Sequence, residues 1–269
     1  MSDTHLLNAV INLSREVGRY QLQQFRQLSP GGGNEKEERE FVSVVDMNSE
    51  EMLKEGLVRL LPEAGFYGEE TGQEGSADLR WVIDPIDGTT NFLSGLDQFC
   101  ISIALEQNQQ CELGIIMRPA SSECFSAIRG QGLFHQGSLC RKAITLPLKQ
   151  ALIGTGFPYR SADLADPFFA CAKDILYRCR GIRRFGSAAL DLCYVATGFL
   201  QGFWESDLKP YDVAAALLFL EETGCIVTNE QGDPYSPYRD RLLICGFPSV
   251  HQELLPLIQN YYQGCQTPD

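Results

Sequence analysis

A segment of nine residues, 84–92, constrains the fold of this chain more than any other. It follows the apolar run Trp81-Val82-Ile83, which predicts a short buried strand, so Asp84 should stand at the carboxyl end of that strand, where α/β sheets place their ligands. Pro85 stiffens the turn that follows, and Gly88 permits a close approach of the backbone to a ligand. The two threonines after Gly88 are suited to cap a helix whose free amides favour an anion.

Two carboxylates lie three residues apart in this segment, Asp84 and Asp87. Mg²⁺ prefers oxygen ligands from a few carboxylates and completes its octahedron with water and substrate oxygens. A phosphate ester is attacked by water when its charge is neutralised and the water is oriented, and paired Mg²⁺ ions do both. A lone pair of aspartates in a turn more often caps backbone amides. The length of this motif favours a metal and phosphate site instead.

The composition limits the partners of the chain. Its 269 residues, 44% apolar and 21% charged, are enough for one domain with a large core. The formal charge of −13 and the pI near 4.7 argue against an electrostatic grip on nucleic acid or on an anionic membrane. We therefore expect neither partner, and a bound polyanion would need help from metal.

Cysteine and histidine usage predicts the compartment and excludes zinc chemistry. The ten cysteines are scattered without a C-x-x-C pair, as expected for small buried side chains in a reducing compartment. The three histidines form no metal-like cluster. The start of the chain lacks a charged region followed by an apolar one, and no run approaches 18 apolar residues. We expect a cytoplasmic protein with no membrane segment.

Hydrophobic periodicity predicts mixed sheets layered with helices. In the first half we expect a helix over 4–28, a mobile loop over 31–40, a strand over 41–45 that ends at Asp46, and a helix from 48–51 to 61. Antiparallel strands are expected over 99–105, 112–117 and 123–128. The second half predicts strands at 151–155, 202–205, 225–229 and 242–246, and helices at 163–178, 187–197, 211–223 and 249–262.

A second polar segment runs from Glu205 to Asp212 and enters an Ala/Leu-rich helix. Pro210 suits the first turn of that helix, which places Asp212 near its N-terminus and within reach of a cation beside the first motif. Taken alone, an acid at this position more often complements the helix dipole. Glu205 taken alone would be a surface charge on an edge strand.

Taken together, these segments resemble the inositol monophosphatase family, the Mg²⁺- and Li⁺-linked phosphatases related to fructose-1,6-bisphosphatase. The resemblance covers nearly the whole chain and rests on residues 42–46, 68–70, 81–92, 186–189 and 205–215. The stretch Leu208-Lys209-Pro210 is similar to the bacterial inositol-1-monophosphatase branch. The resemblance implies a mixed α/β (α+β) fold, layered as an α-β-α-β-α sandwich. It also implies a homodimer of one domain, 1–269, with a metal-site lobe, 1–147, and a substrate-side lobe, 148–269.

The resemblance also implies two to three Mg²⁺ ions. One would be bound by Glu69, Asp84 and the backbone carbonyl of Ile86, and a second by Asp84, Asp87 and Asp212, so that Asp84 bridges the pair. Glu69 would also contact a weaker third ion through water. Mn²⁺ is a possible substitute, and Li⁺ would inhibit by occupying the second site. The family's mobile loop usually carries a lysine near the third ion; Lys36, within 31–40, lies close to that position in the sequence but out of register with it.

The implied reaction is in-line attack of an activated water on phosphorus without a phosphoenzyme. Thr89, oriented by Asp46, and Glu69 would be the catalytic residues, and the amides of Gly88 and Thr89 would hold phosphate oxygens. The polyol would be contacted by Asp87, Gly186, Ser187, Ala188, Glu205 and Asp212.

The expected substrate is a small polyol phosphate, with inositol 1-phosphate converted to inositol and phosphate. Thr90, where related branches more often carry Lys, favours this branch over nucleotide 3′-phosphate and histidinol-phosphate phosphatases, and a sugar phosphatase stays an alternative. A different class is a regulatory protein that binds a transcription or translation partner. Its candidate surface is Arg183-Arg184 in the basic cluster that includes Arg178 and Arg180, although such residues are more often helix-end charges or part of a subunit contact.

Overall fold

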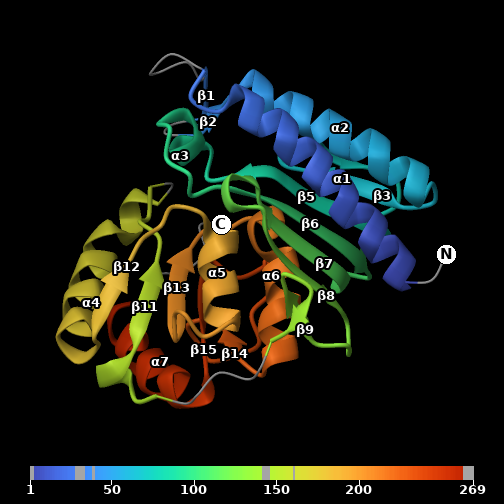
Figure 1. Cartoon of the computed structure of the whole chain (residues 1–269). Coiled ribbons are helices and arrows are strands. Elements are labelled where there is room, and N and C mark those ends of the chain that lie inside the picture. The colour runs from blue at the N-terminus through green and yellow to red at the C-terminus, as the bar shows by residue number, and fades with distance from the viewer. Residues whose placement is uncertain (1–2, 28–33, 38–39, 141–145, 160, 263–269) are drawn as a thin grey trace.

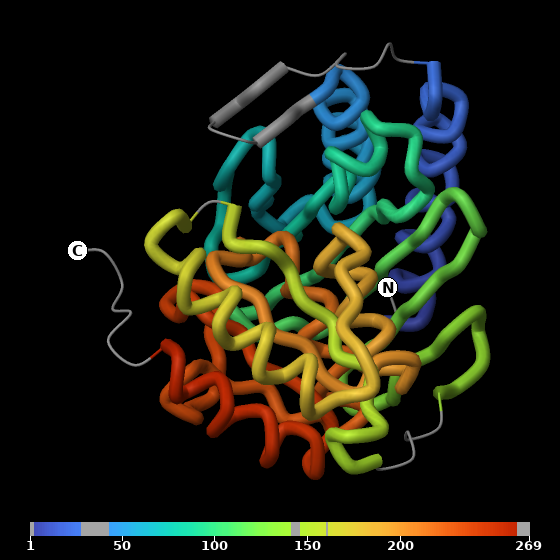
Figure 2. The backbone as a smooth tube through the Cα atoms, turned by 90° about the vertical axis from the view of Figure 1, so that its left-hand side faces the viewer, coloured from blue at the N-terminus to red at the C-terminus, as the bar shows by residue number. Residues whose placement is uncertain are grey.

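Helices and sheets alternate in five layers (Figure 1). The computed structural model describes residues 3–27, 34–37, 40–140, 146–159 and 161–262. Three helix pairs enclose and separate two sheets: α1 (Asp3–Gln24) with α2 (Val44–Leu60), α5 (Ala188–Ala196) with α6 (Pro210–Thr223), and α4 (Ala165–Arg178) with α7 (Pro248–Tyr262). The pair α1 and α2 lies at the opposite end of the molecule from α7, as the rotated view also shows (Figure 2). The expected α-β-α-β-α sandwich is confirmed.

The first sheet has eight strands in the order β10-β9-β8-β7-β6-β5-β3-β4. Their bounds are β3 (Gly65–Gly68), β4 (Gly72–Glu74), β5 (Leu79–Asp87), β6 (Cys100–Gln107), β7 (Gln110–Arg118), β8 (Glu123–Ile128), β9 (Leu133–His135) and β10 (Ser138–Leu139). The antiparallel hairpins expected from the sequence are present, whereas β3 and β5 run parallel with Gly68 opposite Ile83. Because Gly68 lies opposite Ile83 in this parallel pair, Glu69, the residue after β3, lies beside Asp84 of β5.

The second sheet has five strands in the order β12-β11-β13-β15-β14. Their bounds are β11 (Leu152–Thr155), β12 (Gly181–Arg183), β13 (Gly202–Ser206), β14 (Ile226–Thr228) and β15 (Leu242–Gly246). Strand β11 runs parallel to both β12 and β13, with Thr155 opposite Trp204. The chain therefore leaves β11 at Gly156 beside Glu205, and because β13 is the central strand, Glu205 is not an edge charge.

The middle layer is apolar on all sides because it packs against both sheets. Helix α6 buries Val213, Ala214, Ala215 and Ala216 in succession, and small side chains let both sheets approach it closely. This packing holds the N-terminus of α6 in a fixed place. Within the described segments, no helix is both long and apolar enough to cross a bilayer.

The remaining short elements are α3 (Thr89–Leu93), β1 (Asn34–Glu37), β2 (Glu40–Val42) and three 3₁₀ turns at Pro119–Ser121, Leu148–Gln150 and Ala162–Leu164. Strands β1 and β2 pair as an antiparallel hairpin where a loop over 31–40 was expected. The other residues of that expected loop, and the side chain of Lys36, lie outside the described part of the chain. Helix α1 ends at Gln24, four residues earlier than predicted, because residues 25–27 form a turn.

The start of α2 was also predicted wrongly, because the expected strand ended at Asp46. Instead, Ser43 caps the helix: its side chain accepts hydrogen bonds from the amides of Val45 and Asp46, and Asp46 accepts one from the amide of Ser43 at 3.0 Å. This reciprocal capping starts the helix at Val44 and places Asp46 in its first turn.

Candidate active site

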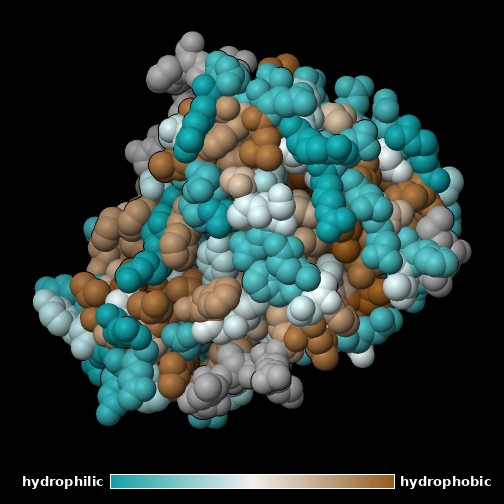
Figure 3. Space-filling view, in the orientation of Figure 1, coloured by the Kyte–Doolittle hydropathy of each residue, from teal (hydrophilic) through white to brown (hydrophobic). Residues whose placement is uncertain are grey.

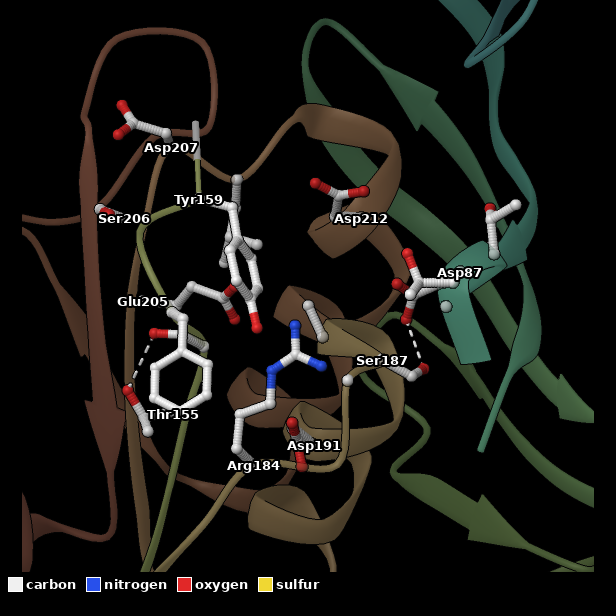
Figure 4. Close-up of a pocket in the computed structure, with 18 of the residues that line it drawn as sticks. Asp87, Thr155, Tyr159, Arg184, Ser187, Asp191, Glu205, Ser206, Asp207 and Asp212 are labelled. Carbon is white, nitrogen blue, oxygen red and sulfur yellow. Dashed lines mark hydrogen bonds between the residues drawn. The ribbon is translucent and has the colours of Figure 1, made fainter. Parts of the chain in front are cut away.

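A cavity of about 410 Å³ opens where the two sheets meet. Its wall is formed by the carboxyl ends of β3, β5, β11 and β13 and by the N-termini of α3, α5 and α6 (Figure 4). Segments far apart in the sequence therefore converge on one opening. Of the predicted site residues, the following line it: Glu69, Asp84, Ile86, Asp87, Gly88, Thr89, Gly186, Ser187, Ala188, Glu205 and Asp212.

Three aspartates form the centre of the cavity. Asp84, Asp87 and Asp212 are buried, and each offers a carboxylate oxygen within 4.8 Å of the other two. Burial, reinforced by neighbouring carboxylates, raises the pKa of Asp87 to about 7, that of Glu69 to about 8, and that of Asp84 well above its usual value. Because clustered buried carboxylates repel one another and all the donors are oxygens, the set fits a hard divalent cation.

An irregularity in β5 brings the first two aspartates together. Asp84 pairs with Ser102 and Asp87 with Cys100, so three steps along β5 match two along β6. In a regular strand, residues three apart point to opposite faces, and the extra residue of a bulge corrects this. The prediction that Asp84 ends its strand is therefore wrong, because β5 continues to Asp87.

The turn after β5 depends on Gly88. Its φ of 99° is left-handed, and a Cβ there would lie 2.8 Å from the carbonyl oxygen of Gln98. Gly88, rather than a threonine, occupies the N-cap of α3, so the expected threonine cap is not formed. Thr89 begins the helix, and its Oγ1 lies 3.1 Å from Asp46 Oδ1 and 3.0 Å from the carbonyl oxygen of Ile86.

The predicted pairing of Thr89 with Asp46 is thus present behind the cavity. Asp46 is fully buried and also contacts the hydroxyl of Ser43. Burial raises the pKa of Asp46 to about 6, although hydrogen bonds from Ser43 and Thr89 oppose the shift. Above neutral pH the carboxyl group is therefore suited to accept a hydrogen bond from the Thr89 hydroxyl.

Asp87 is anchored from the second half of the chain. One oxygen, Oδ2, accepts hydrogen bonds from Ser187 Oγ at 2.5 Å and from the amide of Ala189 at 2.7 Å. Both donors lie at the N-terminus of α5. Asp212 is oriented similarly, since its Oδ2 accepts the amide of Lys209 at 2.7 Å. The hydroxyl of Ser187 is therefore directed at Asp87, a role that the sequence did not indicate.

Glu205 forms the opposite wall with two glycines. A Cβ on Gly156 would lie 1.8 Å from Glu205 Oε1, so the carboxylate packs directly over this glycine. Gly186 has a φ of 87°, and a Cβ there would lie 2.3 Å from Arg184 Nη1. These glycines give the wall its shape.

Among the residues of this wall that sequence reasoning did not assign to the site are Arg184 and Asp191. Arg184, expected on a partner surface, points into the cavity between Glu205 and Ser187 (Figure 4), with its guanidinium 5.3 Å from the ring centroid of Tyr159. Asp191 is 1% exposed, and its Oδ1 has no hydrogen-bond partner among the described residues. The sequence did contain an indication of Asp191, because it is the one acid in the otherwise apolar sequence of α5.

The arrangement combines an acid cluster that could hold a cation with a polar wall that could bind hydroxyl groups.

Comparisons with known proteins gave the following matches. Residues 2–263 match the model of the inositol monophosphatase family. The chain is 38% identical to the putative Nus factor SuhB of Neisseria meningitidis serogroup B, over 94% of this chain and 97% of that protein. It is 34% identical to the inositol-1-monophosphatase of Rhizobium meliloti, over 96% and 98%. The structure of the Thermotoga maritima IMPase superposes with a TM-score of 0.86 at 28% identity, covering 95% of this chain and 97% of that one.

Proposed function

Because the chain belongs to the inositol monophosphatase family, we propose that it is a Mg²⁺-dependent phosphomonoesterase that hydrolyses a small polyol phosphate. Inositol 1-phosphate, converted to inositol and phosphate, is the substrate we favour. The observation that carries the proposal is the convergence of Asp84, Asp87 and Asp212 beside a cavity wall that contains Glu205.

We assign one cation to Glu69, Asp84 and the carbonyl of Ile86, and a second to Asp84, Asp87 and Asp212. A third, weaker cation would lie beyond Glu69, and Mn²⁺ would substitute for Mg²⁺. When bound, these ions supply charge neutralisation at the phosphate and increase the acidity of water. The acids from the proposed metal-site lobe, 1–147, and Asp212 from the proposed substrate-side lobe, 148–269, hold them jointly.

The protein's own groups orient the reactants. The Thr89 hydroxyl donates a hydrogen bond to Asp46, which leaves a lone pair of Oγ1 to accept a hydrogen bond from the attacking water. The amides of Gly88 and Thr89 hold phosphate oxygens. Glu205 accepts hydrogen bonds from vicinal hydroxyl groups of the polyol. The backbone from Gly186 to Ala188 completes the polyol site.

Rates on four substrates test the proposal: inositol 1-phosphate, adenosine 3′,5′-bisphosphate, histidinol phosphate and fructose 1,6-bisphosphate. We expect inositol 1-phosphate to be hydrolysed fastest, with Mg²⁺ required and Li⁺ inhibitory. Asp87→Asn and Asp212→Asn should each lose at least about a hundredfold in kcat/KM, since each removes a ligand charge. Near wild-type Mg²⁺-dependent activity in either variant would refute the two-metal assignment.

A second candidate function is supported by the name of a relative, the putative Nus factor SuhB. In this alternative the chain binds a transcription or translation partner through an exposed basic surface. Arg183 and Arg184 are both exposed, but Arg184 also lines the cavity, so Arg183→Glu is the cleaner charge reversal. Loss of a partner in a pull-down by Arg183→Glu, but not by Arg178→Glu, with activity intact, would support this role. If Arg183→Glu captures the same proteins as the wild type, the surface around Arg183 is not a partner-binding site.

We also propose a homodimer in the cytoplasm. Two large apolar side chains seven residues apart on α4, Phe169 and Leu176, are 61% and 53% exposed. Hydrophobic side chains also gather on the side of the molecule where α4 lies (Figure 3). Size-exclusion chromatography with light scattering should give twice the chain mass of 30.0 kDa. The nine cysteines in the described segments are free, as suits a reducing compartment, and cell fractionation would test the location.

A further inference from the structure

Glu50 is a buried acid outside the cavity that bonds to main-chain amides. It lies in α2 and is 1% exposed. Its Oε2 accepts a hydrogen bond from the amide of Glu70 at 3.0 Å, and its Oε1 accepts one from the amide of Thr71 at 2.8 Å. Such charge-assisted bonds are stronger than neutral ones, and they compensate for burying the carboxylate.

The turn that Glu50 holds carries Glu69. The amide of Glu69 itself donates to the carbonyl oxygen of Ile83 at 3.2 Å, next to Asp84 on β5. Residues 69–71 are therefore fixed from two sides, by β5 at Glu69 and by α2 at the next two amides. This double attachment determines the direction in which the Glu69 side chain leaves the backbone.

Gly68 is part of the same fit. A Cβ at this position would lie 2.5 Å from the carboxyl carbon and from Oε2 of Glu50. Contacts this short require something to move, so a glycine here allows the Glu50 carboxylate to sit under the end of β3. The glycine at position 68 and the burial of Glu50 therefore belong to the same contact, between the Glu50 carboxylate and the backbone at the end of β3.

Helix α2 makes two other contacts with the same site. Asp46 contacts Thr89, and Ser49 accepts a hydrogen bond from Gln21, whose amide also donates to the carbonyl oxygen of Pro85 at 2.8 Å. Three neighbouring polar residues of one helix are therefore connected to two segments of the site, 85–89 and 69–71. Glu50 makes the contact that reaches the Glu69 turn.

We propose that Glu50 is a positioning residue that orients Glu69 for a divalent cation. The inference rests on the proposed function only in taking a cation as the ligand of Glu69. A neutral amide at position 50 would turn its own N–H groups toward at least one backbone N–H, so one of the two bonds would be lost and the turn would shift. Outer partners of this kind affect cation affinity about ten- to hundredfold.

The test compares Glu50→Gln with Glu51→Gln, which makes the same charge change on the exposed neighbouring residue. Free Mn²⁺ measured by EPR gives cation affinity without reference to activity. We expect Glu50→Gln to bind Mn²⁺ about ten- to hundredfold more weakly, with kcat recovered largely at saturating Mg²⁺, and Glu51→Gln to match the wild type. Mn²⁺ affinity within twofold of wild type in Glu50→Gln would overturn the proposal.

A second variant keeps the test decisive if Glu50→Gln does not fold. Gly68→Ala leaves Glu50 in place but displaces its carboxylate, and it should weaken Mn²⁺ binding in the same direction. Unchanged affinity there would also overturn the proposal. The proposed function is tested separately. If the wild-type protein binds Mn²⁺ but hydrolyses no phosphate ester, the proposed function is wrong, and the comparison of Mn²⁺ affinities still decides the role of Glu50.

Discussion

Protons and divalent cations should compete for the acid cluster, so the stability of the metal-free protein should fall as the pH rises. The folded-state pKa of Glu69 is raised from its ordinary value of 4.5 to about 8, mainly by burial and then by Asp212. A group whose pKa is raised by folding binds its proton more tightly in the native state. Its contribution to stability is therefore complete below pH 4.5 and is lost as the pH rises toward 8.

The size of the loss follows from the shift. For Glu69 alone, the difference between its folded-state and unfolded-state pKa makes the free energy of unfolding ~3 kcal/mol smaller at about pH 8 than at about pH 5.5. Glu69 is only partly buried, so water reduces this to about 1–3 kcal/mol. A loss of 1 kcal/mol lowers Tm by ~2–4 °C in a chain somewhat smaller than this one, so Tm in EDTA should fall by about 2–12 °C. Mg²⁺ should restore more stability at the higher pH, where fewer protons compete with it.

Thermal unfolding followed by circular dichroism, in EDTA and in excess Mg²⁺ at both pH values, measures the effect. Asp212→Asn is the matched control, because it removes the largest neighbouring charge that acts on both Glu69 and Asp87. It should raise Tm in EDTA at the higher pH and reduce the response to Mg²⁺. Equal Mg²⁺ stabilisation at the two pH values would refute the reasoning, as would an Asp212→Asn protein that behaves like the wild type.

Two other substitutions test the cavity wall and the buried charge network. Arg184→Gln should raise KM for the polyol phosphate about tenfold, the loss of one hydrogen bond from a charged donor, without changing Mn²⁺ affinity. An unchanged KM, or one that rises equally in Arg178→Gln, would remove Arg184 from the substrate site. Glu106→Ala should lower the free energy of unfolding in urea by about 3–5 kcal/mol, because it leaves Arg80, 4% exposed and 3.1 Å from Glu106, buried without its charge partner. A loss below about 1 kcal/mol would show that Tyr238, which donates to Glu106 at 2.7 Å, or water compensates.

Features that depend on local sequence were predictable. The helix that starts at Pro210 and the strands β7 and β8 are present close to their expected positions, because apolar spacing and a first-turn proline act over a few residues. Asp84, Asp87 and Asp212 were predicted to share a site by resemblance, and the structure brings them together.

Features that depend on distant contacts were not predictable. The bulge between Asp84 and Asp87 is defined by the pairing of β5 with β6. The hydroxyl of Ser187 donates a hydrogen bond to Asp87, a hundred residues away in the sequence. Arg184 was assigned to a partner surface because its neighbours in sequence are basic; it is exposed, but it also lines the cavity, next to Gly186. The start of α2 was locally encoded, since Ser43 and Asp46 have capping-box spacing, but the adjacent apolar run was interpreted as a strand.

The packing of α6 between two sheets also has a consequence for biosynthesis. Asp212 stands at the start of this helix, so the acid cluster stays incomplete until most of the chain has left the ribosome. A nascent fragment that ends before α6 presents Glu69, Asp84 and Asp87 without the partner that closes the cluster. The complete ligand set of the proposed cation site therefore exists only after α6 has been synthesised.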